Sequence, residues 1–182
     1  MLKVRLIPCI VTKNELVVQS FNFRKYLPIG NVKTAIEFFV NWDVDEIVIL
    51  DIDASREGRG PNVELVAWAA KECFVPLTIG GGIRTVQHIR DLLKAGADKV
   101  CLNSVVYDHE AFITEAAAVF GCQCITVSID AIETPDGYRV FNHLTRTILP
   151  QTPAEQARRL EGLGAGEIFL NSVDRDGCRQ GY

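Results

Sequence analysis

Hydrophobic and polar positions follow two alternating patterns along the chain. Short runs rich in Val, Ile and Leu are typical of buried strands, and the stretches between them place apolar residues every three or four positions, as amphipathic helices do. The short runs predict six strands, at residues 6–10, 47–50, 77–79, 100–102, 125–129 and 168–170. The other stretches predict helices at residues 32–42, 63–73, 86–95, 109–119 and 153–163, with Asn62, Thr85 and Asp108 at N-cap positions. This alternation favours βαβ units and a parallel sheet.

One segment is repeated within the chain. Residues 96–104 (GADKVCLNS) align without gaps on residues 164–172 (GAGEIFLNS), with identical Gly, Ala, Leu, Asn and Ser positions, and residues 44–50 form a weaker third copy. Repeated βα units within one chain favour a barrel over a doubly wound sheet. The sequence therefore predicts an α/β fold, a (β/α)₈ TIM barrel with a half-barrel internal repeat.

The length changes this expectation. A complete barrel of this kind takes about 250 residues, whereas this chain has 182 and stops just after the sixth predicted strand. We expect residues 1–182 to form a single partial barrel domain, truncated after strand six of eight. A complete six-stranded open sheet is also possible, but it requires an unusual arrangement of its edges.

Composition and charge narrow the class of protein. The chain is 48% hydrophobic and 23% charged, with a net charge of −4 and scattered Lys and Arg, which argues for a globular protein without nucleic-acid partners. No apolar run is long enough to span a bilayer, and the start is too quickly polar for a signal peptide, so we expect a cytoplasmic protein without membrane contact. Of six cysteines only Cys122 and Cys124 are close together, which predicts packed thiols and no metal site.

Four charged residues stand at or near the beginnings of predicted strands: Arg5, Glu46, Lys99 and Glu167. Because inward positions alternate along barrel strands, these two cations and two anions would meet at the bottom of the barrel. Charges in a confined place must pair to offset desolvation, so a structural salt-bridge ring is one interpretation. A gate for a small neutral molecule is the second.

The opposite end of the barrel carries candidate phosphate ligands. Three glycines, Gly80 to Gly82, follow the third predicted strand, where backbone N–H groups can approach an anion unhindered by side chains. Asn103 and Ser104 end the fourth strand and add amide and hydroxyl donors. A glycine triplet can also be only a tight turn, but its place at the catalytic face of a barrel favours a phosphate cradle.

Carboxylates follow the later strands. Asp130 ends the fifth strand, while Asp174, Asp176 and Gly177 follow the sixth, so these side chains would face the mouth where general acid–base chemistry takes place. Asp130 is the preferred catalytic candidate, although such residues can also cap a turn or pair with an arginine. Asp51, Asp53 and Glu57 form another cluster without a ligand-spaced His, which predicts loop orientation or closure on a ligand rather than a metal site.

These segments together resemble the cyclase subunit of imidazole glycerol phosphate synthase, over the whole chain. The resemblance rests on M-L-x-x-R-x-I-x-C at residues 1–9, D-E-I-V-I-L-D-I-D-A-S-x-E-G-R at 45–59, P-L-T-I-G-G-G-I-R at 76–84, G-A-D-K-V-x-L-N-S at 96–104, I-D-A at 129–131 and G-A-G-E-I-x-L-N-S-x-D-R-D-G at 164–177. It implies a barrel that takes ammonia from a glutaminase partner and joins it to a bis-phosphorylated ribosyl intermediate, closing an imidazole. No cofactor is expected.

The resemblance also implies roles for individual residues. Arg5, Glu46, Lys99 and Glu167 would form the charged entrance for ammonia, and Asp98 would lie at the glutaminase interface. Gly82, Asn103 and Ser104 would hold one substrate phosphate, and Gly177 would contribute to the second. Asp130 matches a catalytic position, and Asp176 matches a functional, ligand-facing residue at the mouth.

Three departures from the family pattern lie at the mouth. The aspartate that the family places at the end of the first strand is Val11 here, the lysine of the following loop is Gln19, and the Gly-Lys-Lys-like stretch after strand five reads Leu144-Thr145-Arg146-Thr147. Because valine cannot transfer a proton, the pattern predicts that ammonia delivery is retained while ring closure is weakened or replaced.

Four functions are compatible with these residues. The leading one is a cyclase-type subunit of a glutamine-dependent, ammonia-channelling synthase in histidine biosynthesis. A paralogue could instead act as an ammonia conduit for an enzyme that aminates a nucleotide-linked sugar in surface-polysaccharide synthesis. The third is the sister isomerase of histidine synthesis, which uses no ammonia, and the fourth is an inactive barrel fragment.

Overall fold

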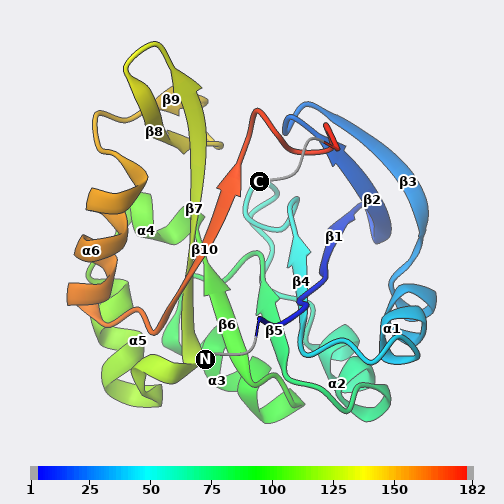
Figure 1. Cartoon of the computed structure of the whole chain (residues 1–182). Helices are drawn as coiled ribbons and strands as arrows, with labels where there is room; N and C mark the ends of the chain where they lie inside the picture. The colour runs from blue at the N-terminus through cyan, green and yellow to red at the C-terminus, as the bar shows by residue number, and fades with distance from the viewer. Residues whose placement is uncertain (1–3, 180–182) are drawn as a thin grey trace. The chain divides into compact units, whose positions relative to one another are not determined.

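The computed structural model describes residues 4–179 and divides into two compact units. Among the described residues, the first unit comprises 4–18 and 28–100, and the second comprises 19–27 and 101–179. Both units contain strands and helices (Figure 1).

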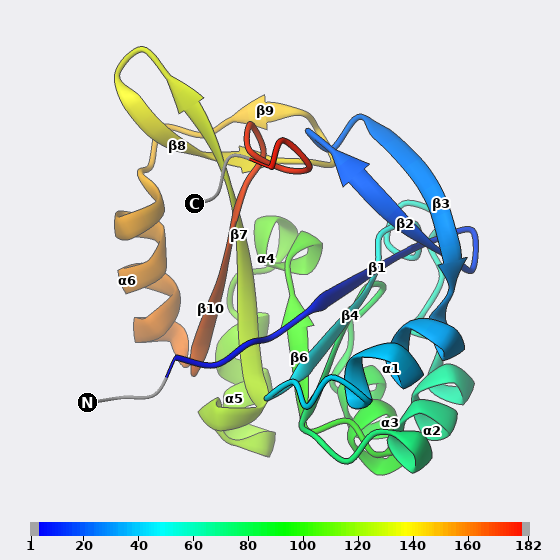
Figure 2. The ribbon, with the colours of Figure 1, turned by 45° about the vertical axis from the view of Figure 1, so that its right-hand side comes forward.

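The first unit is built on a parallel sheet in which β4 lies between β1 and β5. Residues Ile47, Val48 and Ile49 of β4 are buried, as expected for a strand covered on both faces. Figure 2 shows β1 and β4 running side by side, and β2 turns back antiparallel to β1. The elements are β1 (Cys9–Lys13), the start of β2 (Leu16–Phe21), the end of β3 (Lys25–Asn31), α1 (Val32–Val40), β4 (Ile47–Asp51), α2 (Val63–Glu72), β5 (Leu77–Gly80), α3 (Val86–Ala95) and the start of β6 (Lys99–Leu102). Residues 19–27 of the β2–β3 hairpin belong to the second unit.

The second unit is centred on β7, which pairs parallel with β10 and antiparallel with β8. The first seven residues of β7 are buried, whereas its end and the short β9 are more exposed. The elements are α4 (Ser104–Asp108), α5 (Phe112–Phe120), a 3₁₀ turn (Cys122–Cys124), β7 (Ile125–Thr134), β8 (Gly137–Asn142), β9 (Thr147–Ile148), α6 (Pro153–Leu163) and β10 (Glu167–Ser172).

All six predicted strands are present, as β1, β4, β5, β6, β7 and β10. The first was predicted to start too early, because β1 begins at Cys9 and the Leu6 and Ile7 side chains are exposed. Four further strands, β2, β3, β8 and β9, were missed because they form antiparallel hairpins with polar or exposed positions and lack a continuous apolar run. Parallel pairing of β1 with β4, β4 with β5 and β7 with β10 confirms the α/β class.

The five predicted helices are also present, two of them with the predicted bounds. The side chains of Asn62 and Thr85 cap α2 and α3 by accepting from the N–H groups of Leu65 and His88. The prediction for Asp108 was wrong, because this residue ends the short helix α4 and α5 begins later, at Phe112.

The repeated sequence segments have the same local structure. Gly96 ends α3 and Gly164 ends α6, both in the left-handed conformation with φ of 111°. A Cβ on Gly164 would lie 2.8 Å from that of Ala117, and a Cβ on Gly96 would also collide, with Ala70. Each glycine therefore allows a helix end to pack closely before the next strand, β6 or β10, begins three residues later.

Candidate functional site

A buried carboxylate gathers the strand-start charges of the first unit. Glu46 is only 2% exposed, and the Nζ of Lys99 lies 3.0 Å and 3.1 Å from its two carboxylate oxygens. The hydroxyl of Thr78 in β5 donates to the same carboxylate at 2.9 Å, and Nη1 of Arg5 lies 3.8 Å from it. Three of the four predicted residues therefore converge, and the hydrogen bonds offset the desolvation of Glu46.

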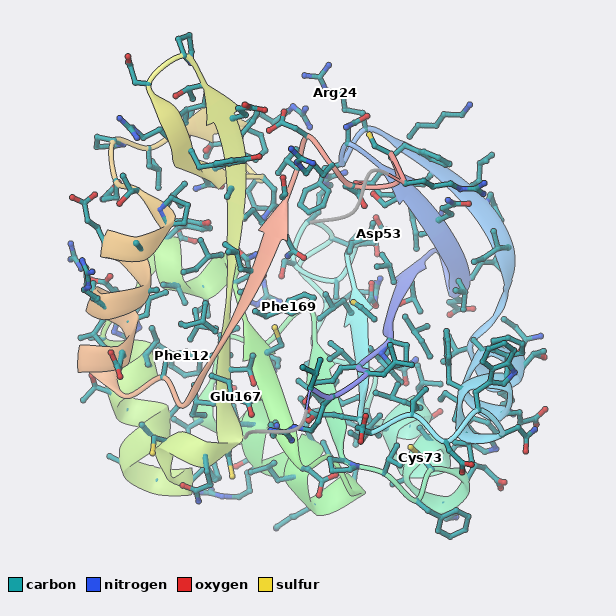
Figure 3. The ribbon with its side chains drawn as sticks, viewed as in Figure 1. Arg24, Asp53, Cys73, Phe112, Glu167 and Phe169 are labelled. Atoms are coloured by element: carbon teal, nitrogen blue, oxygen red, sulfur yellow. The ribbon has the colours of Figure 1, made fainter. Side chains whose placement is uncertain are left out.

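The fourth residue, Glu167, belongs to the second unit. It begins β10, as labelled in Figure 3, and its carboxylate accepts from the Thr126 hydroxyl of β7 at 3.4 Å. Its half-buried position at a strand start agrees with the alternation that the sequence pattern predicts.

The glycine triplet lies in a tightly packed turn of the first unit. Gly82 has φ of +70°, and its N–H group donates to the hydroxyl of Ser55 at 3.2 Å. A Cβ at this position would lie 2.6 Å from the carbonyl oxygen of Arg59, so a larger residue cannot be accommodated without displacing the loop. Gly82 thus holds the 54–60 loop against the end of β5.

Asp130 lies at the centre of a hydrogen-bond network in the second unit. The residue is 1% exposed, and its carboxylate accepts from the amide groups of Asn103 and Asn171, each at 2.9 Å. Nδ1 of His143 lies 3.0 Å from Asp130 Oδ2. The prediction that Asp130 ends its strand was wrong, because β7 continues to Thr134 in the hairpin with β8. The carboxylate lies in a polar cluster and has little access to solvent.

Asn103 and Ser104 lie beside this carboxylate. Among the described residues, the buried Oδ1 atom of Asn103 has no hydrogen-bond partner. The Nδ2 atom of Asn103 donates to the Asp130 carboxylate. The Ser104 hydroxyl lies 3.5 Å from Nε2 of His143. Burial, and secondarily the Asp130 carboxylate, raise the pKa of the nearby Tyr107, whose hydroxyl donates to the carbonyl of Phe141 at 3.2 Å.

His143 is a functional candidate that the sequence interpretation did not single out. It directly follows β8, a strand that the hydrophobic pattern did not predict, so its place at a strand end was hidden. Recognition of the β7–β8 hairpin from the turn at Asp136-Gly137 was the signal that could have located it.

Asp176 and Gly177 anchor the turn between β2 and β3. The Asp176 carboxylate accepts from the hydroxyl of Ser20 at 2.5 Å and from the N–H of Phe23 at 3.1 Å. Gly177 has φ of +71°, and a Cβ on it would lie 2.7 Å from the Phe21 ring. Both predicted ligand-facing residues therefore hold this turn against the end of β10.

The remaining predicted positions are spread over both units. Asp98 is exposed, and its carboxylate accepts from the N–H of Leu77 at 2.8 Å, which ties β6 to β5. Val11 is half-buried in β1 opposite Leu50 of β4, and Gln19 lies in β2. In the 144–147 turn, Arg146 lies over the Phe141 ring, 5.8 Å from its centre.

Asp53, labelled in Figure 3, forms a separate buried pair in the first unit. Its carboxylate accepts from Nζ of Lys13 at 2.7 Å and from the N–H of Asn14 at 3.0 Å. Burial acts to raise the pKa of Asp53, but these hydrogen bonds and the Lys13 charge outweigh it and hold the pKa below the ordinary value.

Neither a metal-binding cluster nor a membrane-spanning helix is found in the described part of the chain. Residues 4–179 contain no group of three or more His, Cys, Asp or Glu side chains placed to hold a metal ion. Among the helices in this range, none combines the length and apolar character needed to cross a membrane.

The profile of the histidine biosynthesis protein family matches residues 5–182 of the chain. The chain belongs to this family. Within the histidine biosynthesis protein family, it is 65% identical over 182 residues to a protein of Vibrio vulnificus (strain YJ016) named "Putative imidazole glycerol phosphate synthase subunit hisF2". The match covers 100% of this chain and 67% of that protein.

A second relative in the histidine biosynthesis protein family carries the same name. This protein of Campylobacter jejuni subsp. jejuni serotype O:2 is 42% identical over 182 residues, covering 100% of this chain and 72% of its own length. Both relatives confirm the resemblance to the cyclase-type subunit that the sequence segments indicated.

Proposed function

We propose that this chain is the cyclase-type subunit of a glutamine-dependent, ammonia-channelling synthase of the imidazole glycerol phosphate synthase type. The observation that carries the proposal is the convergence of Lys99, Thr78 and Arg5 on the buried carboxylate of Glu46. A buried ion pair can often be replaced by apolar residues without loss of stability. Its presence here therefore favours a functional role for these charges over a purely structural one.

The proposal assigns the ammonia entrance to Arg5, Glu46, Lys99 and Glu167, and the glutaminase contact to Asp98. The phosphorylated ribosyl substrate would be held through Gly82, Asn103, Ser104, Asp176 and Gly177, with Asp130 in the catalytic cluster. The (β/α)₈ barrel is the proposed architecture, with β1, β4, β5, β6, β7 and β10 as six of its eight strands. The name of the relatives, which describes a synthase subunit, supports a partner subunit of the glutaminase type.

A second function is favoured by the residues at the mouth. Val11 cannot exchange a proton, and Gln19 and the 144–147 turn lack the lysines of the family pattern. The chain would then conduct ammonia from the glutaminase to a separate enzyme that aminates a nucleotide-linked sugar.

Glutaminase stimulation separates these functions. The chain is mixed with candidate glutaminase partners and the bis-phosphorylated ribosyl substrate, and glutamate and imidazole product are followed separately. Glutamate together with imidazole product is the expected result for the synthase. Glutamate without imidazole product would support the conduit, and absence of both with every partner would contradict the two proposals.

A further inference from the structure

Three side chains of the second unit form a continuous polar chain from the interior to the surface. Asp130 comes from β7, His143 follows β8, and Ser104 begins α4. Nδ1 of His143 lies 3.0 Å from Asp130 Oδ2, and Nε2 lies 3.5 Å from the Ser104 hydroxyl. The order carboxylate, imidazole, hydroxyl is the one in which a buried acid orients a histidine.

Hydrogen bonding defines which imidazole nitrogen carries the proton. Asn103 and Asn171 donate amide protons to the two oxygens of Asp130, so this group acts as an acceptor-only carboxylate. The Nδ1 atom facing it must then be the donor. In the neutral imidazole this leaves Nε2 without a proton and able to accept one.

Asp130 and His143 differ in solvent exposure. The side chain of Asp130 is 2% exposed, whereas that of His143 is 24% exposed. A bound molecule can therefore reach the imidazole while the carboxylate stays covered. The 3.5 Å separation between Ser104 and Nε2 is a weak hydrogen bond at most, which a substrate donor can displace.

We infer that Nε2 of His143 is the proton-transfer atom of this unit and that Asp130 is a positioning residue, which fixes the tautomer and balances the imidazolium charge. This inference rests on the proposed function as an ammonia-using synthase. It assigns the acid–base work to a residue other than the first-strand position, where Val11 stands.

His143 can carry the protons that move when ammonia adds to the substrate. Ammonia adds to a carbonyl carbon of the substrate, forming the C–N bond while the π electrons of the C=O bond move to oxygen. Nε2 takes a proton from the attached ammonium, and His143 becomes an imidazolium that donates to Asp130 through Nδ1. The same proton passes from Nε2 to the oxyanion, which gives a carbinolamine and returns His143 to its neutral form. A second proton, carried from nitrogen to the hydroxyl in the same way, breaks the C–O bond, releases water and leaves an imine.

The first test is the tautomer of His143 in the whole chain. The chain has three histidines, so ¹⁵N spectra of wild type, His88→Gln and His109→Gln assign the His143 signals. The expected result is an Nδ1-protonated neutral ring that becomes a mixture of tautomers in Asp130→Asn. An Nε2-protonated ring in wild type would overturn the inference.

The second test is turnover driven by ammonium chloride with the bis-phosphorylated ribosyl substrate, which needs no glutaminase. His143→Asn can keep a donor to Asp130 but has no titratable nitrogen, and its rate is expected to fall by about 10²- to 10⁴-fold. Substrate affinity should stay within about twofold, the spread expected when only chemistry is lost. His109→Gln, changed at an exposed histidine that faces Glu115, is the control and should keep the wild-type rate.

Chemical rescue distinguishes a chemical role of His143 from a structural one. His143→Gly should regain part of its rate when imidazole is added, and a residue needed only for packing would show no such dependence. Wild-type turnover with an unchanged rate in His143→Asn would overturn this inference alone. A wild-type chain that forms no product from ammonium would instead contradict the proposed cyclase function, and the proton-transfer step with it.

Discussion

Lys99 reaches both carboxylate oxygens of Glu46 from a strand that begins 53 residues later in the chain, at 3.0 Å and 3.1 Å. The Glu46 side chain is 3% exposed and that of Lys99 is 15% exposed, so the pair is largely removed from water. Breaking such a pair leaves an uncompensated buried charge, whereas removing both partners does not. This asymmetry makes the pair testable.

We expect Lys99→Met to lower the free energy of unfolding by about 3–5 kcal/mol, because the buried Glu46 carboxylate loses the cation that contacts both of its oxygens. The double variant Glu46→Gln with Lys99→Met should lose less, because the Glu46 charge is removed together with that of Lys99. Urea unfolding of the whole chain measures both. Arg159→Met is the matched control, because the Arg159 side chain is 60% exposed and its pair with Glu110 should contribute less than about 1 kcal/mol. Equal losses in Lys99→Met and Arg159→Met would contradict this prediction.

Gly177 tests the anchoring of the turn between β2 and β3. Gly177→Ala combines a left-handed φ of +71° with a collision of the new Cβ against Phe21, so we expect a loss of about 2–4 kcal/mol. Gly137→Ala is the control, since Gly137 has φ of +97° but no atom within 4 Å of an added Cβ. It should cost only about 1 kcal/mol of backbone strain.

Thermal unfolding and limited proteolysis of the 19–27 segment measure the two glycine variants. Gly177→Ala should accelerate cleavage in this segment, because Ser20 and Phe23 are held by the adjoining Asp176. Identical stability and cleavage in the two variants would show that the turn does not depend on Gly177.

The Lys13–Asp53 pair predicts a pH dependence of stability. The pKa of Asp53 lies below its ordinary value in the folded chain, so its contribution is present above the unfolded pKa of about 3.9 and is lost as pH falls through the folded value. Lys13→Met should therefore cost about 1–3 kcal/mol near neutral pH and progressively less in acid.

Unfolding midpoints in urea between pH 7 and pH 3 give this difference directly. In an Asp53→Asn background, the effect of Lys13→Met should lose its pH dependence, since no titrating partner is present. A difference between wild type and Lys13→Met that grows as the pH falls would have the wrong sign and would contradict the assignment to Asp53.

Substitution of Val11 tests whether the missing carboxylate in β1 limits imidazole formation. Val11→Asp places a carboxylate in β1 at the position where the family pattern has its aspartate, and we expect more imidazole product than from Val11→Asn, because only the carboxylate can exchange a proton. The two variants have similar size, which makes the amide a close control. Equal product formation would favour the ammonia-conduit function over a weakened cyclase.

Local sequence predicted most elements but not their partners. The positions of α3 and α6 followed from apolar periodicity, with Thr85 as the predicted N-cap of α3, because these signals act within a few helix turns. The hairpin strands β2, β3, β8 and β9 were missed, because a strand with one solvent-facing side carries a weaker pattern than a buried parallel strand. Asp108 was misassigned because a capping residue type also fits the end of the preceding short helix.

The candidate site shows the same division. Asp130, Asn103 and the charges at Glu46 and Lys99 could be predicted, because strand ends and starts in a βα repeat lie at opposite ends of a sheet. His143 was missed, since its role depends on the β7–β8 hairpin that brings it back to Asp130, 13 residues earlier in the chain, and that hairpin was not predicted.

By itself, the sequence determined the α/β class, the repeat that begins at Gly96 and at Gly164, and the family to which the chain belongs, because these depend on residue type and spacing alone. Only the tertiary structure decided that Lys99 pairs with Glu46, that Asp176 holds Ser20 across 156 residues, and that His143 faces Asp130. Partner choice between distant polar groups depends on chain geometry and burial, since each group could pair with many others in an unfolded chain.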